Sequence, residues 1–154
     1  MNLAFKREII PVFYQLPMDD NRWNVGRFDD IWSGVFLKKA CDILDKNIYN
    51  GHPLCKHNKA ERSTFNDLKK EVEGLEINEH LWDIVNQIEL NTVEKTNNND
   101  YILIYSKIAD KLISGNWSKY TNGEFLTYIG KYMKEWIECL QNLKQSKSYK
   151  LIDE

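Results

Sequence analysis

The chain lacks any long run of apolar residues. Its purely apolar stretches are only a few residues long, as at Ile9 and Ile10, whereas a helix that crosses a bilayer needs about 20. The first eight residues, which are rich in charge, are not followed by an apolar stretch of signal-peptide length. We therefore expect a protein that stays in the cytoplasm and does not enter a membrane.

Cysteines are few, and the usual catalytic motifs are missing. Cys41, Cys55 and Cys139 are odd in number and far apart, which argues against a disulfide framework and for a reducing compartment. The sequence contains no phosphate-binding glycine loop, no Gly-x-Ser-x-Gly and no His-Glu-x-x-His. These absences predict a protein without catalytic residues and without a cofactor.

The composition is that of a globular domain. Hydrophobic residues make up 42% of the 154 residues and charged residues 29%, which excludes the low hydrophobicity of disordered chains. A chain of this length is one domain of ordinary size and buries roughly 70% of its unfolded surface. Because no internal repeat interrupts it, we expect a single helical domain over residues 1–154.

Hydrophobic spacing predicts an all-α bundle of about five to six helices. Asp29 and Asn78 are candidate N-caps, and Thr121 with Glu124 has the spacing of a capping box. Residues 16–28 are expected to form a loop, and residues 144–154 a frayed tail. Residues 2–15 and 101–105 each fit a helix or a strand. The predicted helices cover residues 29–48, 63–74, 78–94, 101–114 and 124–143.

The densest group of reactive side chains is His52, Cys55 and His57, which lie within six positions of an expected loop. These side chains are soft metal ligands, but a structural zinc site needs four ligands at definite spacing. A cysteine nucleophile would also need an orienting acid and an oxyanion hole. The group is therefore a weak candidate for metal binding or catalysis, and we expect a polar surface loop.

Charge is distributed unevenly along the chain. Residues 71–94 contain seven acidic residues and no lysine or arginine. On a helix of 3.6 residues per turn, Leu81, Ile84, Val85 and Ile88 share one face, and acidic residues share the opposite face with Leu90. An acidic face with an apolar anchor suits a basic protein partner. The predicted partner-binding residues are Glu76, Glu79, Trp82, Asp83, Glu89, Leu90 and Glu94.

In size, helicity and the acidic segment 71–94, the chain resembles bacterial toxin-immunity proteins of the colicin or contact-dependent inhibition type. The resemblance implies a non-catalytic inhibitor that neutralises a nuclease toxin by steric and electrostatic occlusion. It further implies a basic toxin domain as the partner, with no direct contact to nucleic acid or membrane, and a monomer or weak dimer.

Three alternatives remain open from the sequence. A phage-type inhibitor or nucleic-acid mimic would show the same acidic face. A small metal-dependent or cysteine-based enzyme would use His52, Cys55 and His57, or the paired glutamates Glu76 and Glu79. A subunit of a homo-oligomer is the third alternative.

Overall fold

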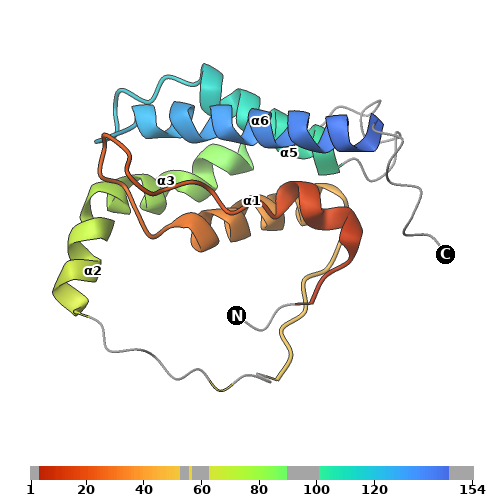
Figure 1. Cartoon of the computed structure of the whole chain (residues 1–154), viewed down its shortest axis with the longest axis horizontal. Coiled ribbons are helices and arrows are strands. Elements are labelled where there is room, and N and C mark those ends of the chain that lie inside the picture. Colours follow the sequence, from red (N-terminus) through yellow and green to blue (C-terminus); the bar gives the residue numbers. More distant parts are fainter. Residues whose placement is uncertain (1–3, 53–55, 57–62, 90–100, 146–154) are drawn as a thin grey trace.

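The computed structural model describes residues 4–52, 56, 63–89 and 101–145, and in these residues the protein is all-α (Figure 1). This confirms the predicted fold class. Two 3-10 turns accompany the α-helices. The elements are η1 (Arg7–Val12), α1 (Asp29–Ile43), α2 (Thr64–Glu71), η2 (Val72–Gly74), α3 (Leu75–Asn86), α5 (Tyr101–Ser114) and α6 (Glu124–Gln145).

Helices α5 and α6 pack against each other and form one side of the core. Ile104, Ile108 and Leu112 recur every fourth residue of α5 and are fully buried, as this spacing predicts for one face of a helix. The two backbones approach closely at Gly130, where an added Cβ would lie 3.0 Å from the carbonyl oxygen of Ala109. The apolar side of α6, within the helix predicted over residues 124–143, is buried at Phe125, Ile129, Met133 and Ile137.

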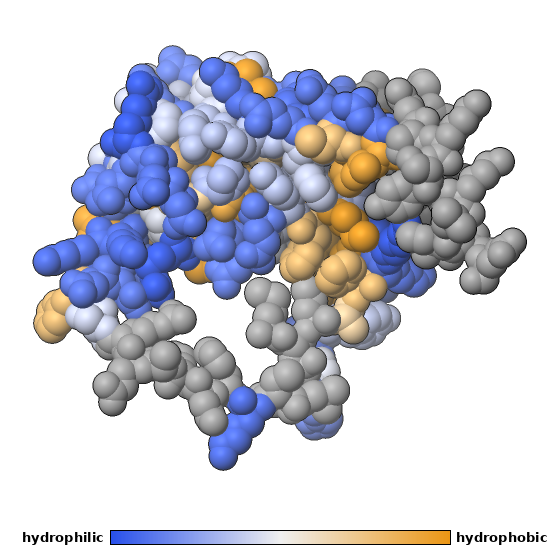
Figure 2. Space-filling view, in the orientation of Figure 1, coloured by the Kyte–Doolittle hydropathy of each residue, from blue (hydrophilic) through white to orange (hydrophobic). Residues whose placement is uncertain are grey.

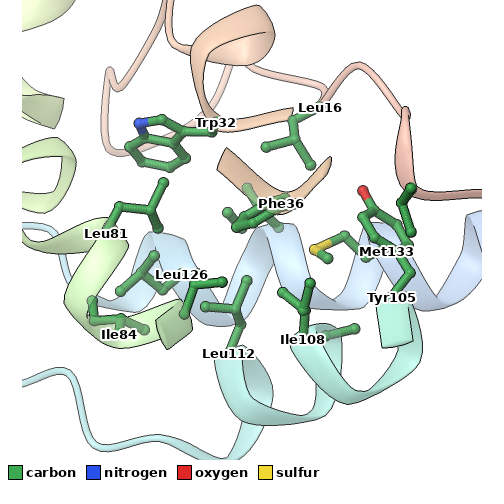
Figure 3. Packing of buried hydrophobic residues seen from close by; sticks show 14 of the residues in the cluster. Leu16, Trp32, Phe36, Leu81, Ile84, Tyr105, Ile108, Leu112, Leu126 and Met133 are labelled. Carbon is green, nitrogen blue, oxygen red and sulfur yellow. The ribbon is translucent and has the colours of Figure 1, made fainter. Parts of the chain in front are cut away.

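Helices α1 and α3 supply the other side of the core (Figure 3). Trp32 and Phe36 of α1 are fully buried, and Leu81 of α3 packs in the same cluster. Lys39 is also buried, and its ammonium donates a 3.0 Å hydrogen bond to the carbonyl oxygen of Asn86. A cation at the carboxyl end of α3 satisfies a helix-terminal acceptor and complements the helix dipole.

The structure corrects the predicted limits of two helices. Helix α1 ends at Ile43 rather than Ile48, because Asp45 takes a left-handed backbone conformation with φ of 53°. Helix α3 begins at Leu75 instead of being capped by Asn78, and it ends at Asn86. Asn78 lies inside the helix, where its side-chain oxygen accepts a hydrogen bond from the Trp32 indole. Residues 90–94 of the predicted helix lie outside the described residues.

The expected capping box at the start of α6 does not form. The backbone N–H of Thr121 donates to the Glu76 carboxylate at 2.8 Å, and Glu124 pairs with Arg22. At the other end α6 continues to Gln145, two residues into the segment expected to fray. Residues 146–154 lie outside the described part of the chain.

The two ambiguous segments are resolved. Residues 101–105 are helical as the first part of α5, and within residues 2–15 the described part contains η1. Pro11 lies inside this short turn; proline has no backbone N–H to donate, which disfavours a longer regular helix here. Among the described residues, no helix is long and apolar enough to span a bilayer.

Candidate functional site

Residues 17–28 form an irregular segment between η1 and α1, and we name them the polar loop. The loop was expected, but three of its non-glycine residues take left-handed backbone conformations: Asp20, Asn24 and Arg27, with φ of 48°, 55° and 67°. Such conformations cost free energy and persist where the surrounding structure enforces them, which is often at binding sites. The concentration of three within eight residues makes this loop the candidate functional site.

The side chain of Asn21 organises the interior of the polar loop. Its amide nitrogen donates to the carbonyl oxygens of Met18 and Val25, at 3.1 and 2.7 Å. Its amide oxygen accepts from the backbone N–H groups of Trp23 and Val25. One side chain thus replaces the regular backbone hydrogen bonds that the loop lacks.

Arg27 fixes the loop to α2. Its guanidinium donates to Glu71 at 2.8 Å and to Asp67 at 2.9 Å. The hydrogen bond to Glu71 is the main reason that the pKa of Arg27 lies above its usual value. The backbone N–H of Gly26 also donates to the carbonyl oxygen of Lys70. The position of α2 is therefore coupled to the conformation of the loop.

The other side of the polar loop is fixed to α6 by an aromatic cluster. The Trp23 ring contacts Phe125 and Tyr128, with ring centroids 5.6 and 5.1 Å apart. The Arg22 guanidinium lies over the Trp23 ring at 4.3 Å and pairs with Glu124. Rigid contacts at both ends preorganise a loop for binding at low entropic cost.

A polar cavity of about 300 Å³ lies between this loop and α2. Carboxylates and cations both line it, and the Asp19 and Asp20 side chains are exposed. The positive charge of Arg27 is offset by Asp67 and Glu71. Such a cavity suits a polar ligand with many hydroxyl groups, since carboxylates accept hydrogen bonds from them. The lining residues are Met18, Asp19, Asp20, Asn21, Asn24, Val25, Gly26, Arg27 and Lys70.

Only some of the residues predicted to form the acidic face lie exposed on α3 or just after it. Glu79, Asp83 and Glu89 are exposed, and Trp82 is 37% exposed with the Lys38 ammonium 5.8 Å from its ring centroid. Glu76 differs, because its carboxylate binds the loop before α6. Leu90 and Glu94 lie outside the described residues. A binding role for these side chains stays a prediction.

Glu76 provides a test of acid sensitivity. Hydrogen bonds from Thr121 lower its pKa from the usual value of 4.5. A carboxyl whose pKa is lower in the folded state stabilises the fold above pH 4.5, and this contribution disappears as the pH falls through the folded-state pKa. We expect the difference in unfolding free energy between wild type and Glu76→Gln to be largest near pH 7 and to shrink below pH 4.5. Urea denaturation at several pH values measures it, and a pH-independent difference would contradict this role.

The cysteine and histidine group cannot be assembled from the described residues. His52 is exposed, whereas Cys55 and His57 lie outside the described ranges. Within those ranges, no group of three or more histidine, cysteine or acidic side chains could hold a metal ion.

Sequence reasoning missed the polar loop as a site, although a signal was present. Asn and Asp tolerate the left-handed region better than other non-glycine residues, and Asp19, Asp20, Asn21 and Asn24 lie close together in it.

The fold and the loop together describe a class of protein: a helical protein with a polar loop that long-range contacts fix to α2 and α6. The model of the reversibly glycosylated polypeptide family matches residues 1–145, and the chain belongs to that family. It is 32% identical to probable UDP-arabinopyranose mutase 1 of Zea mays over 151 residues, which are 95% of this chain and 38% of the relative.

Two further relatives are also named as UDP-arabinopyranose mutases. UDP-arabinopyranose mutase 2 of Arabidopsis thaliana is 31% identical over 144 residues, and UDP-arabinopyranose mutase 1 of Oryza sativa subsp. japonica is 33% identical over 151 residues. These matches cover 93% and 95% of this chain, and 38% of each relative. The chain thus spans less than two fifths of the length of these relatives.

The family corrects the functional expectations from sequence. The resemblance to bacterial toxin-immunity proteins is wrong, and so is the prediction of a basic toxin as the partner, because the relatives are plant proteins named as mutases of a nucleotide sugar. The expectation of a non-catalytic inhibitor is wrong for the same reason. The error arose because an acidic helix, small size and helicity are shared by many unrelated proteins.

Proposed function

We propose that this chain is a helical part of a UDP-arabinopyranose mutase system and that its polar loop contributes to the binding of the nucleotide sugar. The observation that carries the proposal is the family match over residues 1–145. The strained loop, fixed to α2 and α6 around a polar cavity, supports the location. The match covers 38% of the maize relative, and the proposal concerns the residues of this chain alone.

The size and charge of the cavity favour the sugar end of the ligand. A volume of about 300 Å³ lies at the lower limit for ligand pockets, which suits a pentose ring better than a whole nucleotide sugar. In this proposal Asp19 and Asp20 accept hydrogen bonds from the sugar hydroxyls. Lys70 also lines the cavity, and in this proposal its ammonium pairs with the diphosphate.

The Asp20→Asn variant tests the site. The left-handed conformation at position 20 is one that asparagine adopts readily, so the fold is retained while the negative charge is lost. Because a hydrogen bond to a charged group is worth about 1.5–3 kcal/mol, we expect the variant to bind UDP-arabinopyranose at least about tenfold more weakly. NMR titration of the isotope-labelled chain measures the affinity and identifies the perturbed amides.

The matched control is Glu79→Gln, which neutralises an exposed carboxylate on α3, outside the cavity lining. This control should bind like wild type. In the wild-type chain, UDP-arabinopyranose should perturb residues 18–27 and Lys70, and UDP alone should perturb them less. Wild-type spectra in which the loop does not respond to UDP-arabinopyranose would contradict the proposal.

A cytoplasmic location is part of the proposal. Cys41 is buried and Cys139 is exposed, and both are free thiols, which is typical of a reducing compartment. Fractionation of cells that express the tagged protein would test this.

A further inference from the structure

Helix α2 is held to the molecule without help from the hydrophobic core. None of its eight residues is buried. Among the described residues, no apolar side chain of α2 belongs to the core cluster or packs against it. A surface helix of a globular protein is normally held by its apolar side. Other contacts must therefore fix the position of α2.

Arg27 of the polar loop supplies such a contact. Its guanidinium donates to Asp67 and Glu71, which lie one helical turn apart on α2. The three side chains are 33%, 29% and 34% exposed, so solvent ions screen these pairs less than they screen fully exposed ones. Because the guanidinium is planar and its donors are fixed, binding two carboxylates at once defines the position of α2 relative to the loop.

The same contact region includes Lys70. Its carbonyl oxygen accepts a 3.1 Å hydrogen bond from the backbone N–H of Gly26, the residue before Arg27. Two neighbouring loop residues thus hold a single turn of α2, and Lys70 of that turn lines the polar cavity. Figure 2 shows mainly hydrophilic surface at the left edge, where Figure 1 places α2 and the polar loop.

We propose that Arg27 is a positioning residue: by holding Asp67 and Glu71, it places Lys70 at the cavity, where Lys70 binds the diphosphate of the nucleotide sugar. The inference rests on the proposed function, which supplies this ligand. Arg27 also lines the cavity, but its positive charge is already compensated by two carboxylates. We therefore assign it to the placement of Lys70 and not to direct contact with the phosphates.

The double variant Asp67→Ala/Glu71→Ala tests the proposal, because it releases Arg27 and leaves every residue of the polar loop unchanged. Alanine favours helix, so α2 itself should still form. The loss of two negative charges would by itself strengthen the binding of an anion, whereas loss of the position of Lys70 weakens it. We expect UDP-arabinopyranose to bind at least about tenfold more weakly, measured by NMR titration. Adding Lys70→Ala to the double variant should weaken binding little further, because residues that act as a unit are not additive.

Amide exchange measures the position of α2 without any ligand. The Gly26 N–H donates to Lys70, so its exchange rate reports this contact directly. We expect the Gly26 amide to exchange at least about tenfold faster in the double variant than in wild type. The matched control is Asp110→Ala, which breaks an ion pair with Lys134 between α5 and α6, outside the cavity lining. The control should change neither the exchange of Gly26 nor the affinity for UDP-arabinopyranose.

Two results would overturn the proposal. Stronger binding in the double variant would mean that the released Arg27 contacts the phosphates itself. Unchanged exchange at Gly26 would mean that contacts other than those of Arg27 hold α2 in place. Failure of the wild-type chain to bind UDP-arabinopyranose would instead disprove the proposed function, and the exchange comparison would still decide whether Arg27 holds Lys70 at the cavity.

Discussion

Replacement of Trp32 by alanine is expected to destabilise the protein by about 3–5 kcal/mol, the usual cost of removing a large aromatic side chain from a core. Trp32 is fully buried. Its ring lies against Phe28 and Phe125, with centroids 5.5 and 6.0 Å apart, and its indole N–H donates to Asn78 at 3.0 Å. This one side chain therefore connects the end of the polar loop, α3 and α6.

Thermal and chemical denaturation measure the effect. For a domain of this size, a loss of 3–5 kcal/mol lowers the melting temperature by roughly 10 °C. The Trp82→Ala variant is the matched control, because Trp82 is 37% exposed on α3 and its loss should cost less than about 1 kcal/mol. Similar losses in the two variants would contradict the assignment of Trp32 to the core.

The helices could be predicted from sequence because their signals are local. Ile104, Ile108 and Leu112 lie four residues apart, and Ser63 caps α2 by accepting a hydrogen bond from the Asn66 N–H. Helix ends were less predictable where tertiary contacts decide them. Asn78 has a good capping side chain, but its hydrogen bond with Trp32, 46 positions away, keeps it within α3.

Amphipathicity predicted which side of α3, α5 and α6 faces the core, but it did not predict the orientation of α2. Phe65, Leu68 and Val72 have the spacing of one apolar side in the predicted helix 63–74, yet they are exposed. The ion pairs of Arg27 with Asp67 and Glu71 determine how α2 is oriented, and such long-range pairs have no local sequence signal. The contacts of the polar loop with α2 and α6 likewise join distant segments, so the local signal for this candidate site is limited to its cluster of Asp and Asn residues.

The joint between α2 and α3 shows how closely the loop and the helices are coupled. Gly74 is buried there, and an added Cβ would lie 2.6 Å from Cε2 of Phe28 and 2.9 Å from Cγ1 of Val25. Both neighbours are buried residues of the polar loop. We expect Gly74→Ala to cost about 1–3 kcal/mol, as overpacking does in a filled core, and also to weaken binding of UDP-arabinopyranose because Val25 lines the cavity.

Gly34→Ala is the matched control, and it should raise the free energy of unfolding instead of lowering it. Gly34 lies within α1, and no atom is within 4 Å of the position of an added Cβ. Alanine there gains about 0.5–1 kcal/mol through its higher helix propensity, without displacing a neighbour. Urea denaturation of both variants measures the pair of effects. Gly74→Ala could instead be as stable as Gly34→Ala and bind the nucleotide sugar like wild type. In that case the close packing of the polar loop against the α2–α3 joint would matter neither for stability nor for affinity. We expect instead that only the substitution at the joint lowers stability and affinity together.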